Sequence, residues 1–153
     1  MEEIRMNDAD FMREAIREAY LARDGGEMPV GCVIARNGEI VARAHNEREA
    51  SLDPTAHAEI LAIRRAAKAL GSWRLTDCVL YVTLEPCPMC AGAIAQSRVR
   101  RLVYGAPDPA YGCAGSVYRI PEDPAFNWFC PCDGGTLAEE CASLLRGFFA
   151  ERR

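Results

Sequence analysis

The apolar and polar residues of this chain alternate with two periods, and each period predicts a different kind of element. Before the glycine pair at 25–26, apolar residues recur every three or four positions, as in a helix that lies on a core. Asn7 or Asp8 can cap this helix at its N-terminus. Its apolar positions are Phe11, Met12, Ala15, Ile16, Ala19 and Tyr20.

A hairpin is predicted next. Residues 30–36 and 39–44 are rich in strand-forming residues, and only Asn37 and Gly38 separate them. An Asn-Gly pair between two such runs is the preferred two-residue turn of antiparallel strands. We therefore predict a β-hairpin over residues 30–44.

A second helix is predicted from Pro54 to Leu70. Asp53 can serve as its N-cap, proline is favoured in the first turn, and Gly71 ends it. This start places His57 in the first turn and Glu59 in the second.

The following segment has the order strand, helix, strand. Residues 79–84 predict a buried strand, the run Glu85-Pro86-Cys87-Pro88 breaks it, and a helix continues through Gln96. Residues 99–104 predict the next strand. A parallel crossover is the natural connection between two such strands.

The remainder of the chain divides into a loop region and a last helix. Residues 106–135 are rich in proline and glycine, so we expect mostly loop there. Thr136 can then cap a final helix. Its apolar face would hold Leu137, Cys141, Leu144, Leu145 and Phe148.

Length and composition narrow the class of protein. With 153 residues, half of them hydrophobic, the chain is expected to form a single domain over residues 1–153. It has no apolar run near the roughly 20 residues of a membrane span and begins with acidic residues, so we expect a soluble cytoplasmic protein. Its net charge of −4 argues against nonspecific coating of nucleic acid. Because a hydrophobic core and a cytoplasmic location are expected, thiol or metal roles are favoured over disulfides for its eight cysteines.

One set of residues has what a zinc hydrolase needs, namely three protein ligands, an open position for water and a nearby base. Cys87 and Cys90 are three residues apart at the start of a predicted helix, where the helix dipole favours thiolates and both sulfurs can face one ion. His57 and Glu59 differ by roughly 200° around an ideal helix. We therefore expect the metal to lie off the helix end, where His57 can bind it and Glu59 can reach the bound water.

Each half of this set is ambiguous by itself. A Cys-x-x-Cys pair also occurs in redox sites and in structural zinc sites. A nucleophilic Cys/His pair is a further alternative, but it would leave Cys90 and Glu59 without a role. The other histidine, His45, ends a predicted strand and suits a structural or surface role.

The combined motif is more specific. With Pro86, these residues match the His-x-Glu and Pro-Cys-x-x-Cys signature of zinc nucleobase deaminases. The segment 53–60 reads DPTAHAEI, and the segment 80–93 reads LYVTLEPCPMCAGA. In these segments, and over nearly its whole length, the chain resembles the bacterial tRNA-specific adenosine deaminases.

This resemblance implies a fold, a reaction and a partner. The fold would be cytidine-deaminase-like, a three-layer α/β/α arrangement with a mixed five-stranded sheet. The reaction would be the hydrolytic deamination of adenosine to inosine at the wobble position of a tRNA anticodon, so the partner would be a tRNA anticodon stem-loop. A homodimer is implied, with one Zn²⁺ per chain held by His57, Cys87 and Cys90 and with Glu59 as the proton shuttle.

The resemblance also implies three substrate contacts. Asn46 would hydrogen-bond the edge of a flipped adenine, and Asp108 and Asn127 would contact the nucleotide or its neighbours. Each of the three has an ordinary alternative role as a turn or loop-capping residue.

One segment departs from that family. After Asn127 the bacterial enzymes usually continue with His-Arg, whereas this chain has Trp128-Phe129 followed by Cys130-Pro131-Cys132. The aromatic pair can stack on a base or pack in the core, and we expect core packing. Cys130 and Cys132 are candidates for a second metal, but the sequence offers no evident third or fourth ligand.

Two other functions stay open at this point. A small-molecule purine deaminase, such as a guanine deaminase, shares the zinc signature and needs no RNA-binding surface. An inactive zinc-binding subunit of a heterodimeric deaminase is the other, and Glu59 argues against it because loss of the shuttle is the simplest route to inactivity.

Overall fold

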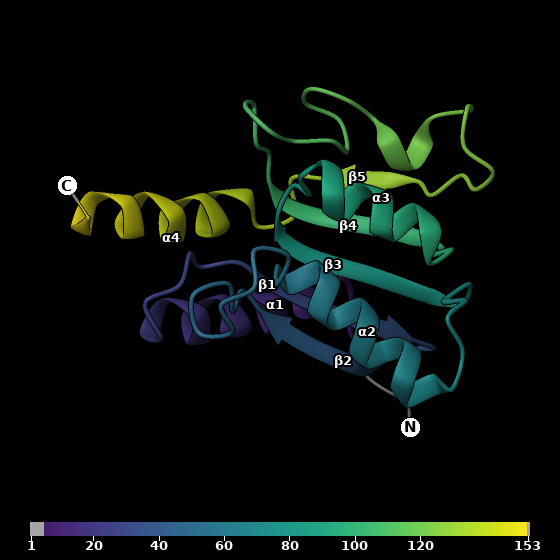
Figure 1. Cartoon of the computed structure of the whole chain (residues 1–153), viewed down its shortest axis with the longest axis horizontal. Coiled ribbons are helices and arrows are strands. Elements are labelled where there is room, and N and C mark those ends of the chain that lie inside the picture. The colour runs from purple at the N-terminus through teal and green to yellow at the C-terminus, as the bar shows by residue number, and fades with distance from the viewer. Residues whose placement is uncertain (1–4, 153) are drawn as a thin grey trace.

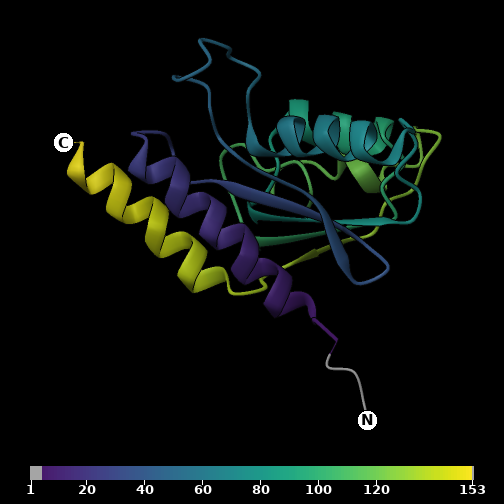
Figure 2. The ribbon, with the colours of Figure 1, turned by 90° about the horizontal axis from the view of Figure 1, so that it is seen from below.

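A central mixed sheet lies between two helical layers (Figures 1 and 2). The structure, a computed structural model, describes residues 5–152. The strands are β1 (Gly31–Arg36), β2 (Glu39–His45), β3 (Cys78–Leu84), β4 (Arg101–Ala106) and β5 (Cys132–Gly134), in the order β2-β1-β3-β4-β5. The helices are α1 (Asp8–Asp24), α2 (Ala58–Leu70), α3 (Pro88–Gln96) and α4 (Ala138–Glu151), with a 3₁₀ turn η1 (Ile120–Glu122). The predicted three-layer α/β/α class with a mixed five-stranded sheet is confirmed.

Strand direction explains why the sheet is mixed. The β1–β2 hairpin is antiparallel, with Asn37 and Gly38 both at positive φ as the tight turn requires. β1 also pairs antiparallel with β3, whereas β3–β4 and β4–β5 are parallel. The predicted hairpin and parallel crossover are therefore confirmed.

Successive strand residues point to opposite faces of the sheet and pack in two separate hydrophobic cores. Cys32 and Ile34 pack with α2 and α3, while Val33 and Ala35 pack with α1 and α4. Figure 2 shows α1 and α4 side by side on one face of the sheet and α2 on the other. Because both faces are covered, β1 and β3 are buried along almost their whole length.

Several boundaries differ from the sequence-based prediction. α2 begins at Ala58 rather than Pro54, because the Asp53 carboxylate accepts hydrogen bonds from the backbone and hydroxyl of Thr55 and closes a separate turn. β4 begins at Arg101, two residues late, after a left-handed residue at Arg98. Thr136 does not cap α4: the N-cap position is Leu137, with no side-chain hydrogen bond.

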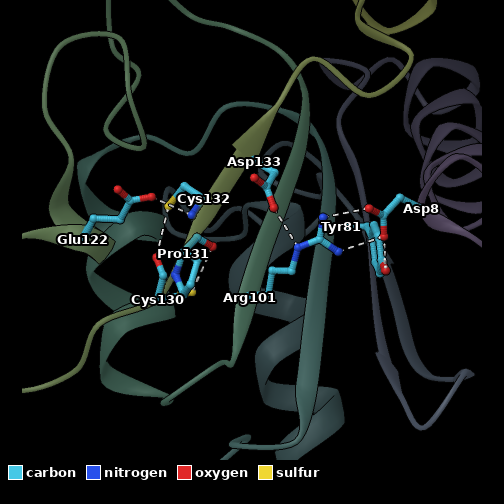
Figure 3. A network of polar contacts seen from close by, with 8 residues as sticks. All are labelled: Asp8, Tyr81, Arg101, Glu122, Cys130, Pro131, Cys132 and Asp133. Carbon is cyan, nitrogen blue, oxygen red and sulfur yellow. Dashed lines mark hydrogen bonds and ion pairs between the residues drawn. The ribbon is translucent and has the colours of Figure 1, made fainter.

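An ion-pair network ties α1 to the far side of the sheet (Figure 3). The Arg101 guanidinium lies 2.7 Å from Asp8 Oδ2 and 2.7 Å from Asp133 Oδ2. The Tyr81 hydroxyl donates a 2.8 Å hydrogen bond to Asp8. One arginine therefore joins α1, β4 and β5.

Among the described residues, no helix is both long and apolar enough to cross a membrane.

Candidate metal centre and adjoining cavity

Three potential ligands converge where two helices begin. Within residues 5–152, His57, Cys87 and Cys90 are the one such group whose donor atoms all lie within 4.8 Å of one another. His57 Nδ1 is 3.7 Å from Cys87 Sγ and 3.6 Å from Cys90 Sγ. Tetrahedral zinc with Zn–S near 2.3 Å and Zn–N near 2.1 Å requires an N···S separation of about 3.6 Å. The donor set therefore fits a zinc ion.

The local folding of both helices explains this convergence. His57 is the N-cap of α2 and Cys87 is the N-cap of α3, with Pro88 in the first helical position. Cys90 follows one turn later and is fully buried. The three potential ligands lie at the ends of the two helices, where the metal was expected, although His57 lies before α2 rather than in its first turn.

The electrostatics of the site favour a thiolate ligand. The pKa of Cys87 falls to about 4, chiefly because the Cys90 thiol hydrogen-bonds to it and also because His57 lies beside it. The pKa of His57 rises, mainly through its hydrogen bond with Cys87. A charged sulfur is thus stabilised where a cation would bind.

Glu59 is a buried acid beside these ligands. It is the second residue of α2, and its side chain is 4% exposed. Burial raises its pKa to about 7, so the carboxyl can both release and accept a proton near neutral pH. It also lines the cavity described next.

A cavity of about 610 Å³ opens next to the potential ligands. Its walls include His57, Glu59 and Cys87 together with Asn46, which directly follows β2. Asn46 is buried, and its Oδ1 has no hydrogen-bond partner within the described residues. A buried amide oxygen without a partner is costly, so this group is suited to pair with a polar ligand.

The other two predicted substrate contacts lie in different places. Asp108 lines the same cavity, and its side chain accepts hydrogen bonds from the backbone of Ala110 and Tyr111. Asn127 lies in a separate hollow of about 220 Å³ beside the C-terminal end of α3. The structure therefore brings Asn46 and Asp108, but not Asn127, to the cavity beside the potential metal ligands.

A second carboxylate in the cavity wall has a different environment. Glu85 follows β3, is 2% exposed, and accepts hydrogen bonds from Asp108, Ala114 and Ser116. Burial alone would raise its pKa, but these hydrogen bonds hold the pKa below its usual value. Glu85 is thus favoured in its ionised form, whereas the Glu59 carboxyl can exchange its proton near neutral pH.

The segment that departs from the bacterial family is mostly structural. Trp128 is half-buried against the core, and its indole N–H donates to the Val99 carbonyl at 2.8 Å, which confirms core packing for this residue. Phe129 is exposed, so core packing is wrong for it. Figure 3 shows Cys130 and Cys132 beside Glu122, and in the described residues no metal-binding group includes them.

Besides apolar residues, the sequence did not reveal four polar or aromatic residues of the cavity wall, which are Arg48, Glu85, Tyr111 and Phe149. Arg48 lies two residues after Asn46 and Glu85 two residues before Cys87, so proximity to a motif was an available signal. Tyr111 and Phe149 come from a loop and from α4. No local pattern marks them.

Comparison with known proteins identifies the class. Residues 5–106 match the family model described as the cytidine and deoxycytidylate deaminase zinc-binding region. The chain therefore belongs to this zinc-binding deaminase family, and zinc is its cofactor.

Particular relatives lie within that class. The tRNA-specific adenosine deaminase of Bacillus subtilis is 51% identical over 95% of this chain and 91% of the relative. That of Streptococcus pyogenes serotype M18 is 43% identical over 94% and 90% of the two chains. A solved structure from work on A-to-I editing by tRNA:A34 deaminases is 44% identical, with a TM-score of 0.85 over 88% of this chain and 98% of the other. Guanine deaminase from Bacillus subtilis is 38% identical, with a TM-score of 0.66 over 96% and 94%.

Proposed function

We propose that this chain deaminates adenosine to inosine at the wobble position of a tRNA anticodon. The observation that carries the proposal is the placement of Glu59, a buried acid with a pKa of about 7, in one cavity with His57, Cys87 and the unpartnered Oδ1 of Asn46. The identity of 51% to a tRNA-specific adenosine deaminase supports the choice of substrate.

The residues have separate tasks in this mechanism. His57, Cys87 and Cys90 would hold the zinc ion. When bound, zinc supplies a Lewis acid that makes water a nucleophile near neutral pH. Glu59 takes one proton from water and passes it to the purine ring nitrogen, then takes the remaining proton of the added hydroxyl and delivers it to the departing amine, so that adenosine and water yield inosine and ammonia. Asn46 orients the base through its side-chain amide.

The rim of the cavity supports a polynucleotide substrate. The exposed rings of Tyr111 and Phe149 and the cation of Arg48 line the same cavity as the proposed reaction centre. Aromatic rings bind unpaired bases by stacking, and an arginine can contact a phosphate. These groups can hold the nucleotides that flank a flipped adenosine, with Asp108 in the same wall. Asn127 would contact RNA only if the RNA, or a second copy of the chain, reaches its separate hollow.

We also propose that residues 1–153 act as one domain, as a homodimer in the cytoplasm. One five-stranded sheet packs against α1, α2 and α4, and α3 packs on α2 and shares a core cluster with strand residues, which supports a single domain. The homodimer and the location follow from the resemblance to tRNA-modifying enzymes, and light scattering on purified protein measures the dimer directly.

A comparison of four substrates tests the function. Purified protein is mixed with an adenosine-containing anticodon stem-loop, free adenosine, free guanine or cytidine, and inosine, xanthine and uridine are measured. We expect inosine from the stem-loop at a far higher kcat/KM than from free adenosine, because flanking nucleotides supply binding energy. Faster conversion of free guanine would contradict the proposal.

Guanine deamination is the second candidate. The 38% identity to a guanine deaminase over 96% of this chain favours it, and the same zinc site would serve. The exposed aromatic rim has no task with a free base, so we rank this function second.

A further inference from the structure

Glu85 forms a saturated hydrogen-bonding centre inside the cavity wall. Its two carboxylate oxygens accept backbone N–H bonds from Asp108 and Ala114, both at 3.0 Å, and from Ser116 at 2.9 Å. The Ser116 hydroxyl donates a fourth bond. A carboxylate has about four acceptor sites, so this one has none left for substrate.

These bonds hold one particular loop. Residues 107–111 line the cavity, and the amides that bind Glu85 lie at the beginning of that stretch and just beyond its end. Gly112 lies against the carboxylate so closely that a Cβ there would be 2.3 Å from Glu85 Cδ. The loop therefore has little freedom to shift relative to β3.

The geometry points to Glu85 as a positioning residue that fixes the wall formed by residues 107–111 before substrate arrives. It does not touch the reacting atoms or carry a proton. Through the loop it sets the positions of Asp108 and Tyr111, and so the affinity for the nucleotides around the target base. This inference rests on the proposed function and deepens it.

Glu85→Gln tests the inference, because it replaces one carboxylate oxygen by an NH2 group. This group donates hydrogen bonds and cannot accept those of the backbone N–H groups that face it. We expect KM for the anticodon stem-loop to rise about tenfold or more, since buried amides left without acceptors are costly, while kcat changes less than about threefold. Zinc content should stay as in the unmodified protein. Hydrogen exchange at the amides of Asp108, Ala114 and Ser116 should accelerate.

Two further variants make the result specific. Glu122→Gln is the matched control, because Glu122 also accepts a backbone N–H, from Cys132 at 2.7 Å, but lies outside the cavity wall. It should leave KM unchanged. Ser116→Ala removes one of the four hydrogen bonds and should raise KM less than Glu85→Gln does. The double variant should have a KM close to that of Glu85→Gln alone.

The outcomes separate the possible failures. An unchanged KM in Glu85→Gln, or a fall in kcat or zinc content at constant KM, overturns the positioning role. If Glu85→Gln does not fold, Ser116→Ala decides: wild-type KM and wild-type exchange overturn the inference, and a raised KM with faster exchange supports it. If the unmodified protein deaminates no RNA, the proposed function fails, whereas the exchange experiment still shows whether Glu85 holds the loop.

Discussion

Two buried glutamates border the same cavity with opposite protonation behaviour. Glu59 is buried at the start of α2, and burial raises its pKa to about 7. Glu85 is equally inaccessible, but its hydrogen bonds keep its pKa below the usual value. Environments that separate the pKa values of two carboxyls assign the acid–base task to one of them. At the residue scale, this difference supports the proposals that Glu59 carries protons and that Glu85 anchors the loop.

Glu59→Gln is predicted to abolish turnover without loss of metal. The amide keeps the size of the side chain but cannot move protons, so kcat should fall at least about 100-fold, the low end of general acid–base contributions. Elemental analysis should still find one zinc per chain. Cys87→Ala is the contrasting variant and should lose zinc as well as activity.

Near-normal deamination by Glu59→Gln would refute the shuttle role. Loss of zinc from the same variant would mean that Glu59 is a ligand. The three-ligand site with an open fourth position would then be wrong.

At the scale of elements, the cavity is assembled from loops that follow strands. Asn46 follows β2, Glu85 follows β3, and the loop with Asp108 and Tyr111 follows β4. α4 adds Leu145 and Phe149 to the cavity wall. The starts of α2 and α3 therefore position the potential metal ligands and Glu59, the residues after the strands complete the wall, and a loop and the last helix form the rim proposed to contact flanking nucleotides.

Tyr111→Ala is predicted to weaken RNA binding. Stacking of one base on an aromatic ring contributes roughly 1–3 kcal/mol, so KM for the stem-loop should rise about fivefold or more with kcat nearly unchanged. Tyr118→Ala is the matched control, because Tyr118 is similarly exposed and lies in the same region but not in the cavity wall. Equal effects of the two substitutions would remove Tyr111 from the binding surface.

At the scale of the whole molecule, the Arg101 network joins segments that are far apart in the chain. The hydrogen bonds that Arg101 donates to the Asp8 carboxylate lower the pKa of Asp8 below its value in an unfolded chain. A lowered pKa in the folded state means that Asp8 contributes stability above the unfolded pKa of about 3.9 and loses that contribution as pH falls through the folded value.

Asp8→Asn is predicted to make the free energy of unfolding depend less on pH in the acidic range. At pH 7 the free energy of unfolding of the variant should be about 1 kcal/mol lower than that of the unmodified chain, which is the upper end for partly exposed ion pairs. The difference should shrink below pH 4, as measured by urea unfolding at several pH values. Asp77→Asn, an exposed aspartate before β3, controls for the change in charge. A constant difference across pH would show that the ion pair is not the cause.

Local patterns predicted most elements because their causes are local. The capping box of Asn7 and Asp10, the Asn37-Gly38 turn and the proline that starts α3 each act within a few residues. The start of α2 was wrong for an equally local reason, since Asp53 bonds to Thr55 and forms a turn instead of a cap. β5 was missed within a loop region because its three residues pair with β4 and have little strand pattern of their own.

The ligand types and their spacing could be predicted from the sequence, because they lie in short segments around His57 and Cys87. The shape of the cavity depends on tertiary packing. The bonds of Glu85 reach 23 to 31 residues along the chain, and Phe149 arrives from the last helix. Asn127, which the family resemblance makes a substrate contact, lies in another hollow. Such placements depend on how loops pack between strands, and no local pattern carries that information.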